Sequence, residues 1–435
     1  MSRPPSSSVV VVFALVVSCT ASAFLQSGQS LLLSHDTFGG APATRRPFAH
    51  HHNADRRHEH HQKQWKRGGC ERHERRRRHD SKMVAIFCFV FLSRMHANAF
   101  SEEDSYATLA GLEEKEGSSG LGLKVVSKAI DTLFAFDPFF DYMVVEAREK
   151  IVKRSYTLGV GWAENVDGMR RNMDELQGEY DRLLDAKVST PSYYYAPFHC
   201  YPEGNLSWQA ALEVEPSAIC VHADIYTGKK GVYERHGDDK LRGNFHQRMK
   251  EMLKGPEPKD ILDIGCSTGL STLKLAETFP SAMITGVDLS PHMLAVGRFF
   301  LRTREEQRHA RGRVEYLHAA GEMTGMGDAS MDLVSLSLTS HELPAEATRE
   351  VFREAFRVLR PGGAISFMDM NPKSPAFQKL ANNPFAFAGF KSTEPYLQEY
   401  ISLDLGKELE AAGFRNPEVR SNSTRHRTCV AYVDK

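Results

Sequence analysis

One stretch of the chain predicts a buried strand that breaks into a glycine turn and then continues as a helix. It reads Asp260-Ile261-Leu262-Asp263-Ile264-Gly265-Cys266-Ser267-Thr268-Gly269-Leu270-Ser271. The next apolar run, 283–288, ends in a second carboxylate, Asp288. This layout places a nucleotide-like ligand over the ends of two adjacent parallel strands. The stretch therefore predicts both the fold class and the position of the site.

Strands and helices alternate from residue 260 to the end of the chain, which is typical of a parallel α/β sheet. We predict helices at 270–279, 291–309, 344–359 and 396–412, and later strands at 283–288, 314–318, 331–338, 364–370, near Glu418 and at 428–433. The last two strands are expected to form an antiparallel pair at the edge. The predicted fold of residues 255–435 is a doubly wound, mostly parallel seven-stranded sheet.

An N-terminal helical and aromatic region is predicted for residues 121–254. Apolar residues recur at helical spacing from 121 to about 184, and 240–253 reads as a helix. Between them lie an aromatic segment, 193–199, and the segment 204–208. We favour packing over ligand contact for these aromatic side chains.

Charge and cysteine content exclude several classes of protein. The chain has 55 basic and 55 acidic residues. The basic excess lies in the first 82 residues, so the remainder is mildly acidic and predicts no nucleic-acid surface. The seven cysteines lack paired or metal-type spacing, which favours free thiols in a reducing compartment. We assign no metal site, and we interpret the histidine clusters at 50–52 and 58–61 as parts of a disordered leader.

The details of the glycine turn disfavour a phosphate ligand. Ser267 replaces the middle glycine of the dinucleotide fingerprint, and Leu270 stands where a phosphate-binding loop requires lysine. Asp263 would repel a diphosphate but attract an ammonium or sulfonium group.

The turn resembles the first motif of the class I S-adenosylmethionine-dependent methyltransferases, which have a Rossmann-like fold. Asp288 matches their ribose-binding acid, and Arg357-Val358-Leu359-Arg360-Pro361-Gly362-Gly363 resembles their late motif. Many relatives have Asp-Ala-Glu after the third strand, where this chain has Ala320-Gly321-Glu322. The resemblance implies S-adenosyl-L-methionine as cofactor, bound by Asp263, Gly265, Cys266, Ser267, Gly269, Asp288, Leu289 and Glu322.

A closer resemblance, over residues 125–435, is to methyltransferases of the ubiquinone/menaquinone-biosynthesis type and their cyanobacterial and chloroplast relatives. It rests on the segments 198–199, 204–208, 341–344, 368–373, 391–396 and 425–428. It implies methyl transfer to a small, hydrophobic, prenylquinol- or phenol-like acceptor, with peripheral membrane contact and no nucleic acid. The alternatives are O- or N-methylation of another metabolite, or a regulator that binds the cofactor without catalysis. The oligomeric state stays open.

Two adjacent residues are the candidate catalytic pair. His341 and Glu342 follow the fourth strand, where an acceptor should approach the methyl group. We interpret His341 either as a general base or acceptor-orienting donor, or as a cap of the helix that follows. Weaker candidates are His199, Tyr195 and Tyr396, with Asp369 and Asn371 at the end of the fifth strand.

An insertion, residues 371–396, separates the fifth strand from the last helix. It contains four phenylalanines: Phe377, Phe385, Phe387 and Phe390. They predict either a lid over a hydrophobic acceptor or packing against the N-terminal helices.

The first hundred residues resemble targeting sequence. Arg3, the apolar run 9–17 and the small residues before Phe24 predict a signal peptide over 1–23. Ala21-Ser22-Ala23-Phe24 resembles the cleavage motif of plastid-targeting sequences in algae with complex plastids. We therefore expect a disordered transit leader over 24–100, a linker over 101–120, and a plastid location, with the secretory or endomembrane system as the alternative.

A second apolar run, 83–92, ends near Ala97-Asn98-Ala99 and resembles a thylakoid-transfer signal. A membrane-associated leader segment and an error in the gene model are alternatives. Transfer into the lumen would separate the site from its cofactor, so we favour a stromal or thylakoid-associated protein.

Overall fold

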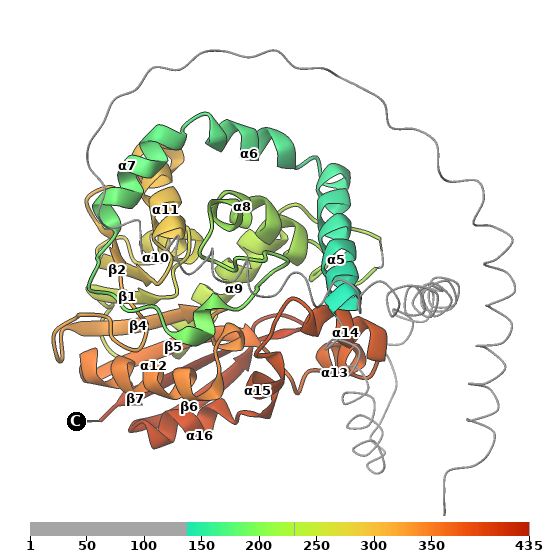
Figure 1. The fold of residues 1–435 in the computed structure, drawn as a ribbon. Coiled ribbons are helices and arrows are strands. Elements are labelled where there is room, and N and C mark those ends of the chain that lie inside the picture. The colour runs from blue at the N-terminus through green and yellow to red at the C-terminus, as the bar shows by residue number, and fades with distance from the viewer. Residues whose placement is uncertain (1–136, 230, 435) are drawn as a thin grey trace, which may run out of the picture. The chain divides into compact units, whose positions relative to one another are not determined.

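The computed structural model describes residues 137–229 and 231–434, whose seven strands form one sheet (Figure 1). The strands are β1 (Asp260–Ile264), β2 (Met283–Asp288), β3 (Val314–His318), β4 (Met331–Ser337), β5 (Leu359–Met370), β6 (Phe414–Ser421) and β7 (His426–Val433). Their order is β3-β2-β1-β4-β5-β7-β6. The first five are parallel, whereas β7 is antiparallel to both β5 and β6. The predicted doubly wound sheet and its antiparallel edge pair are confirmed.

Side chains of successive strand residues enter two different cores, one on each face of the sheet. In β1, Leu262 packs into one core and Ile261 into the other; in β4, Val334 and Leu333 divide in the same way. The first core is covered by α12 (Ala345–Val358), α15 (Leu397–Ser402) and α16 (Leu405–Ala411). The second is covered by α9 (Gly237–Met252), α10 (Leu270–Thr278) and α11 (Pro291–Thr303). Figure 1 shows these two helical layers on opposite sides of the strands.

The N-terminal helices form a third layer that packs on α11. They are α5 (Asp137–Thr157), α6 (Trp162–Arg170), α7 (Met173–Leu183) and α8 (Trp208–His222), with the short η2 (Ser192–Tyr195) between α7 and α8. Their apolar side chains share a core with one face of α11, including Met293, Val296 and Phe300. The predicted signal peptide, leader and linker, and the predicted helical residues up to 136, lie outside the described residues.

Two predicted helices are shorter than expected. The helix from Pro291 ends at Thr303, because Arg304 is extended, and η3 (Glu305–Ala310) follows. The predicted helix over 396–412 is two helices, α15 and α16. Asp404 separates them, and its side chain accepts a hydrogen bond from the Lys407 N–H at the start of α16.

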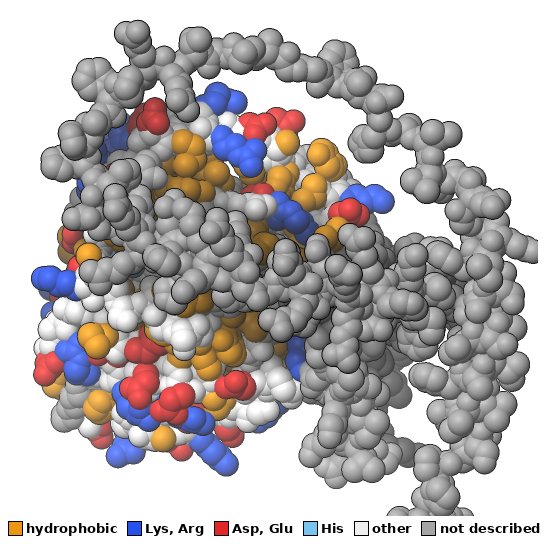
Figure 2. Space-filling model, in the orientation of Figure 1, with side chains coloured by type: hydrophobic (Ala, Val, Ile, Leu, Met, Phe, Trp, Pro, Cys, Tyr) orange, Lys and Arg blue, Asp and Glu red, His pale blue; other side chains and the backbone are white. Residues whose placement is uncertain are grey.

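The insertion after β5 consists of α13 (Pro375–Ala381) and α14 (Pro384–Lys391), and η4 (Ser340–Glu342) follows β4. None of the helices in the described part of the chain has the length and apolar character needed to cross a bilayer. On the face that Figure 2 draws, acidic and basic side chains are interspersed over α12 and α16. Here Arg349 and Arg353 form ion pairs with Glu346, Glu350 and Glu408.

Candidate functional site

The glycine turn brings backbone to the carboxyl ends of β1 and β2. Gly265 has φ of +70°, and a Cβ there would lie 2.6 Å from Cγ2 of Thr339, so only glycine fits. The N–H groups of Gly265 and Cys266 both donate to the Val287 carbonyl oxygen, at 2.9 and 3.1 Å. The turn is therefore held against β2 by backbone contacts.

Two of the predicted cofactor residues lie behind the turn. Asp263 is 1% exposed and accepts a hydrogen bond from Thr272 Oγ1 at 2.7 Å, and burial raises its pKa to about 6. Gly269 begins α10 with φ of +87°, and any side chain there would collide with the Tyr316 hydroxyl. Neither residue lines the cavity described next, so both support the shape of the turn.

A cavity of about 870 Å³ opens at this edge of the sheet, within the range of roughly 300–1,000 Å³ typical of small-molecule sites. Six of the predicted cofactor residues line it: Gly265, Cys266, Ser267, Asp288, Leu289 and Glu322. The same cavity extends to η4 and to the insertion after β5.

Asp288 is held at the end of β2 by backbone donors. Its carboxylate accepts hydrogen bonds from the N–H groups of Ser267 and Ser290, each at 2.8 Å. Burial raises its pKa, and these hydrogen bonds oppose that rise. The arrangement couples the predicted ribose-binding acid directly to the glycine turn.

Two tyrosines of η2 cover the predicted cofactor site, although no sequence pattern had indicated a role for them there. The Tyr194 hydroxyl donates to Asp288 Oδ1 at 3.3 Å, and the Tyr193 hydroxyl donates to Glu322. Both tyrosines line the cavity. The aromatic run 193–195 was the available signal, but its side chains were predicted to serve packing.

His341 lies at the other end of the cavity and is oriented by Asp369. The ring Nδ1 is 2.8 Å from Asp369 Oδ1, and the backbone N–H donates to Asp369 Oδ2 at 3.1 Å. Because Ser337 of β4 pairs with Met368 of β5, the residues after these strand ends meet. Burial opposes a proton on His341, but Asp369 outweighs it and raises the pKa to about 9.

The alternative interpretation of His341 as a helix cap is wrong. The helix α12 begins after Pro344, and no side chain caps its first N–H groups from that position. The ring of His341 contacts Asp369 instead. The residue lines the cavity together with Glu342.

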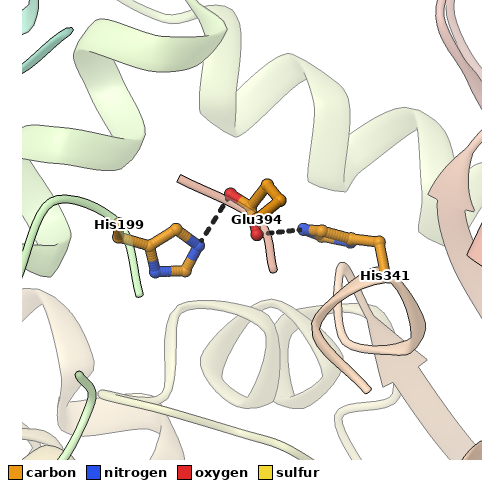
Figure 3. A group of neighbouring side chains, drawn as sticks. All are labelled: His199, His341 and Glu394. Atoms are coloured by element: carbon orange, nitrogen blue, oxygen red, sulfur yellow. Dashed lines mark ion pairs between the residues drawn. The ribbon is translucent and has the colours of Figure 1, made fainter. Parts of the chain in front are cut away.

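Two further side chains complete a polar cluster with this pair. His199 Nε2 is 3.2 Å from Glu394 Oε1 (Figure 3). The same nitrogen is 3.4 Å from Glu342 Oε1. Burial opposes a proton on His199, but the carboxylates of Glu394 and Glu342 raise its pKa to about 10. Glu394 had no predicted role, because nothing in the local sequence indicates that it lies beside His199 and His341.

The other weak candidates lie away from the cavity. Tyr195 is 63% exposed, and the Tyr396 hydroxyl donates to the Tyr193 carbonyl oxygen at 3.0 Å. Asn371 accepts a hydrogen bond from the Lys373 N–H, whereas Met370 before it lines the cavity.

The phenylalanines of the insertion have different surroundings. Phe377 and Phe390 line the cavity, with Leu380 between them. Phe387 is buried in the main core, and α14 packs against α5. The side chain of Phe385 lies outside the described residues.

Comparisons with known proteins identify the family of the chain. A family described as "Methyltransferase domain" matches residues 261–363. An uncharacterised methyltransferase of Synechocystis sp. is 31% identical over 171 residues, covering 39% of this chain and 73% of the relative. Demethylmenaquinone methyltransferase of Listeria welshimeri is 28% identical over 150 residues, covering 34% of this chain and 61% of the enzyme.

Solved structures with some similarity include phosphoethanolamine N-methyltransferase 2 of Haemonchus contortus in complex with S-adenosyl-L-methionine. It has 16% identity and a TM-score of 0.35, over 44% of this chain and 53% of that one. A second structure is a putative O-methyltransferase of Nostoc punctiforme, with 19% identity and a TM-score of 0.36, over 60% of this chain and 68% of that one.

Proposed function

Because the chain belongs to the class I S-adenosylmethionine-dependent methyltransferases, we propose that it methylates a small, lipophilic, prenylquinol- or phenol-like acceptor. The observation that supports this acceptor class is the continuity of one cavity. It joins the glycine turn at Gly265 to the polar pair His341 and Glu342, and then to the apolar side chains of Phe377 and Phe390. The activity in the name of the Listeria relative, on demethylmenaquinone, also supports it.

The residues present fit the cofactor. Gly265 lines the cavity with its backbone, and Asp288 presents a carboxylate at the end of β2. We expect Asp288 to bind the ribose hydroxyls and Glu322 to lie at the adenine end, with Tyr193 and Tyr194 over both carboxylates. When bound, S-adenosyl-L-methionine supplies an electrophilic methyl group.

The chain's own side chains position the acceptor and exclude water. Asp369 orients the His341 ring, so that its Nε2 faces the acceptor end of the cavity. Phe377, Leu380 and Phe390 provide apolar surface for a prenyl chain or an aromatic ring. A prenylated acceptor resides in a membrane, so peripheral membrane contact belongs to the same proposal.

The test is transfer of a labelled methyl group to lipid acceptors. The full chain is incubated with S-adenosylmethionine labelled on its methyl group and a plastid lipid extract, followed by a panel of quinols and phenols. We expect a labelled lipophilic product from the wild type and at least about a hundredfold less from Asp288→Asn, because each lost charged hydrogen bond costs roughly 1.5–3 kcal/mol. The exposed Asp239→Asn should behave as wild type.

Other outcomes distinguish the alternatives. Label only in a water-soluble product indicates O- or N-methylation of another metabolite. A protein that binds the cofactor in calorimetry but labels no acceptor is a binder rather than a catalyst. Cofactor affinity unchanged in Asp288→Asn contradicts the assignment of the cofactor site.

A further inference from the structure

Three side chains with metal-binding chemistry meet at the acceptor end of the cavity. His199 comes from the loop after η2, His341 from η4 and Glu394 from the segment after α14, and Figure 3 shows all three pointing toward one another. One donor atom of each lies within 4.8 Å of the other two. His199 and Glu394 are 195 positions apart in the sequence, so only the fold brings the three side chains together.

The distances are close to those around a bound cation. Ligand atoms about 2.0–2.2 Å from a tetrahedral cation are roughly 3.4 Å from one another. His199 Nε2 is 3.2 Å from Glu394 Oε1, and His341 Nε2 is 4.0 Å from Glu394 Oε2. A small inward movement of the more distant side chains would bring all three donor atoms within coordination distance of one ion. Two imidazoles and a carboxylate suit zinc, manganese, iron or cobalt.

A carboxylate behind His341 supports this interpretation. Histidines that bind metals nearly always donate their second ring N–H to a carboxylate, a carbonyl or water, which fixes the ring and the free nitrogen. Here Asp369 contacts Nδ1 of His341 at 2.8 Å and also accepts its backbone N–H. Nε2 is thereby directed to the cavity and to Glu394.

Glu394 provides an independent sign of a missing ligand. The residue is 5% exposed, and its Oε2 has no hydrogen-bond partner in the described part of the chain. His341 Nε2 is too distant from this oxygen for a hydrogen bond, and buried polar atoms usually have one. A cation between Glu394 and the two histidines would satisfy it.

The backbone holds His199 in place at a conformational cost. Its φ is +50°, in the left-handed region that residues other than glycine seldom adopt. Its N–H donates at 3.0 Å to the carbonyl oxygen of Thr393, the residue before Glu394. Strain of this kind is often found at functional sites, and here it positions one donor beside another.

Positive charge from arginine does not balance the cluster. Glu342, Asp369 and Glu394 contribute three carboxylates around the two imidazoles. The two arginines among the cavity-lining residues form ion pairs elsewhere, Arg242 with Asp238 and Arg425 with Asp224. A divalent cation that replaces the protons of the two histidines would leave the charge of the cluster unchanged.

We propose that His199, His341 and Glu394 bind one divalent cation of the zinc or manganese type. Three protein ligands leave a coordination position open toward the cavity, as in catalytic metal sites. There an acceptor oxygen would coordinate, and the cation would favour its deprotonated form. The binding of the cation does not depend on the acceptor class proposed above.

Cobalt(II) is a suitable probe, because its visible absorption reports ordered coordination. The full chain is freed of metal with a chelator and titrated with Co²⁺, while absorbance and calorimetry are recorded. For the wild type we expect a coordination band that saturates at one equivalent of Co²⁺. Binding should be at least about tenfold weaker in Glu394→Gln, which loses a ligand. It should be about 10–100-fold weaker in Asp369→Asn, which leaves all three ligands in place but alters the support of His341. His309→Gln and Glu410→Gln, at exposed positions, should bind as wild type.

The leader histidines at 50–52 and 58–61 are present in every variant, so differences between variants report the cavity alone. Circular dichroism before titration checks that each variant is folded. If wild type shows no saturating band, or if a folded Glu394→Gln and Asp369→Asn both bind Co²⁺ as wild type does, the cluster is a metal-free ion-pair network and the proposal is wrong. Cofactor binding and methyl transfer to lipids are measured separately by the labelled-methyl experiment, so failure of the metal site is distinguishable from failure of the proposed function.

Discussion

Asp263 and Asp288 stand in equivalent places in the sequence, each in a strand that leads to the site, but packing gives them different surroundings. Asp263 points into the layer of α10, where Thr272 is its hydrogen-bond donor. Asp288 reaches the cavity and accepts hydrogen bonds from the N–H groups of Ser267 in the turn and Ser290 after β2. The motif predicts two acids near the ligand, whereas their different burial depends on which helix packs against each side chain.

His246 makes the folding stability depend on pH. It is 2% exposed in α9, its Nδ1 lies 2.8 Å from Thr278 Oγ1, and burial lowers its pKa to about 3. The imidazole of His246 takes up a proton near pH 6.5 in the unfolded chain but only near pH 3 in the folded chain. The contribution of neutral His246 to the free energy of unfolding is therefore fully present above pH 6.5. It declines as the pH falls toward 3.

We expect the free energy of unfolding to fall by about 2 kcal/mol between pH 7 and pH 5 on account of His246. Urea unfolding of the wild type and of His246→Gln at pH 7 and at pH 5 measures this change in the free energy of unfolding. The variant should be less stable at pH 7 but should lose less stability on acidification. An equal loss in both proteins would show that other groups cause the pH dependence.

At the scale of elements, the insertion after β5 has one phenylalanine of α14 at the cavity and another in the core. Phe390 faces the cavity, whereas Phe387, three residues earlier, is buried in the core. Positions three apart lie on neighbouring parts of a helix surface, so one short helix can contact both. The pattern of apolar residues alone does not tell which phenylalanine has which neighbour.

Phe390→Ala should weaken the binding of a long acceptor more than that of a short one. We expect the KM for a prenylated quinol to rise about tenfold, with a smaller change for an unprenylated phenol, because a buried aromatic contact contributes roughly 1.5–3 kcal/mol. Steady-state kinetics with the prenylated quinol and the unprenylated phenol measures the KM for each. The control is Phe387→Ala, which should cost about 3–5 kcal/mol of stability without selecting between acceptors. Equal rises in KM for both acceptors would contradict a lid over the prenyl chain.

At the scale of the whole molecule, we propose that residues 1–100 direct the protein to a complex plastid. The support is the sequence pattern around Phe24. A fluorescent protein fused behind residues 1–100 should enter the plastid of an alga with such plastids, and Phe24→Ala should keep it in the endomembrane system. If the unaltered fusion is secreted or remains in the endomembrane system, the alternative location is correct.

The sheet was predictable because local signals specify it. Buried parallel strands are short apolar runs, and glycine or proline marks their ends, so all seven strands could be located before the structure. The ends of the helices at Thr303 and Ser402 were not predictable in the same way. They depend on a single extended residue or a capping aspartate within an otherwise helical pattern.

The sequence by itself determined the fold class and the glycine turn, since the residues of the turn lie close together along the chain and several of its positions require a particular residue type. Only the tertiary structure decided that Tyr193 and Tyr194 cover the turn, and that His199 and Glu394 join His341. These side chains are brought together by the packing of loops from three separate regions. Such distant contacts leave no periodic or local pattern in the sequence, because each residue is compatible with many neighbours until the chain has folded.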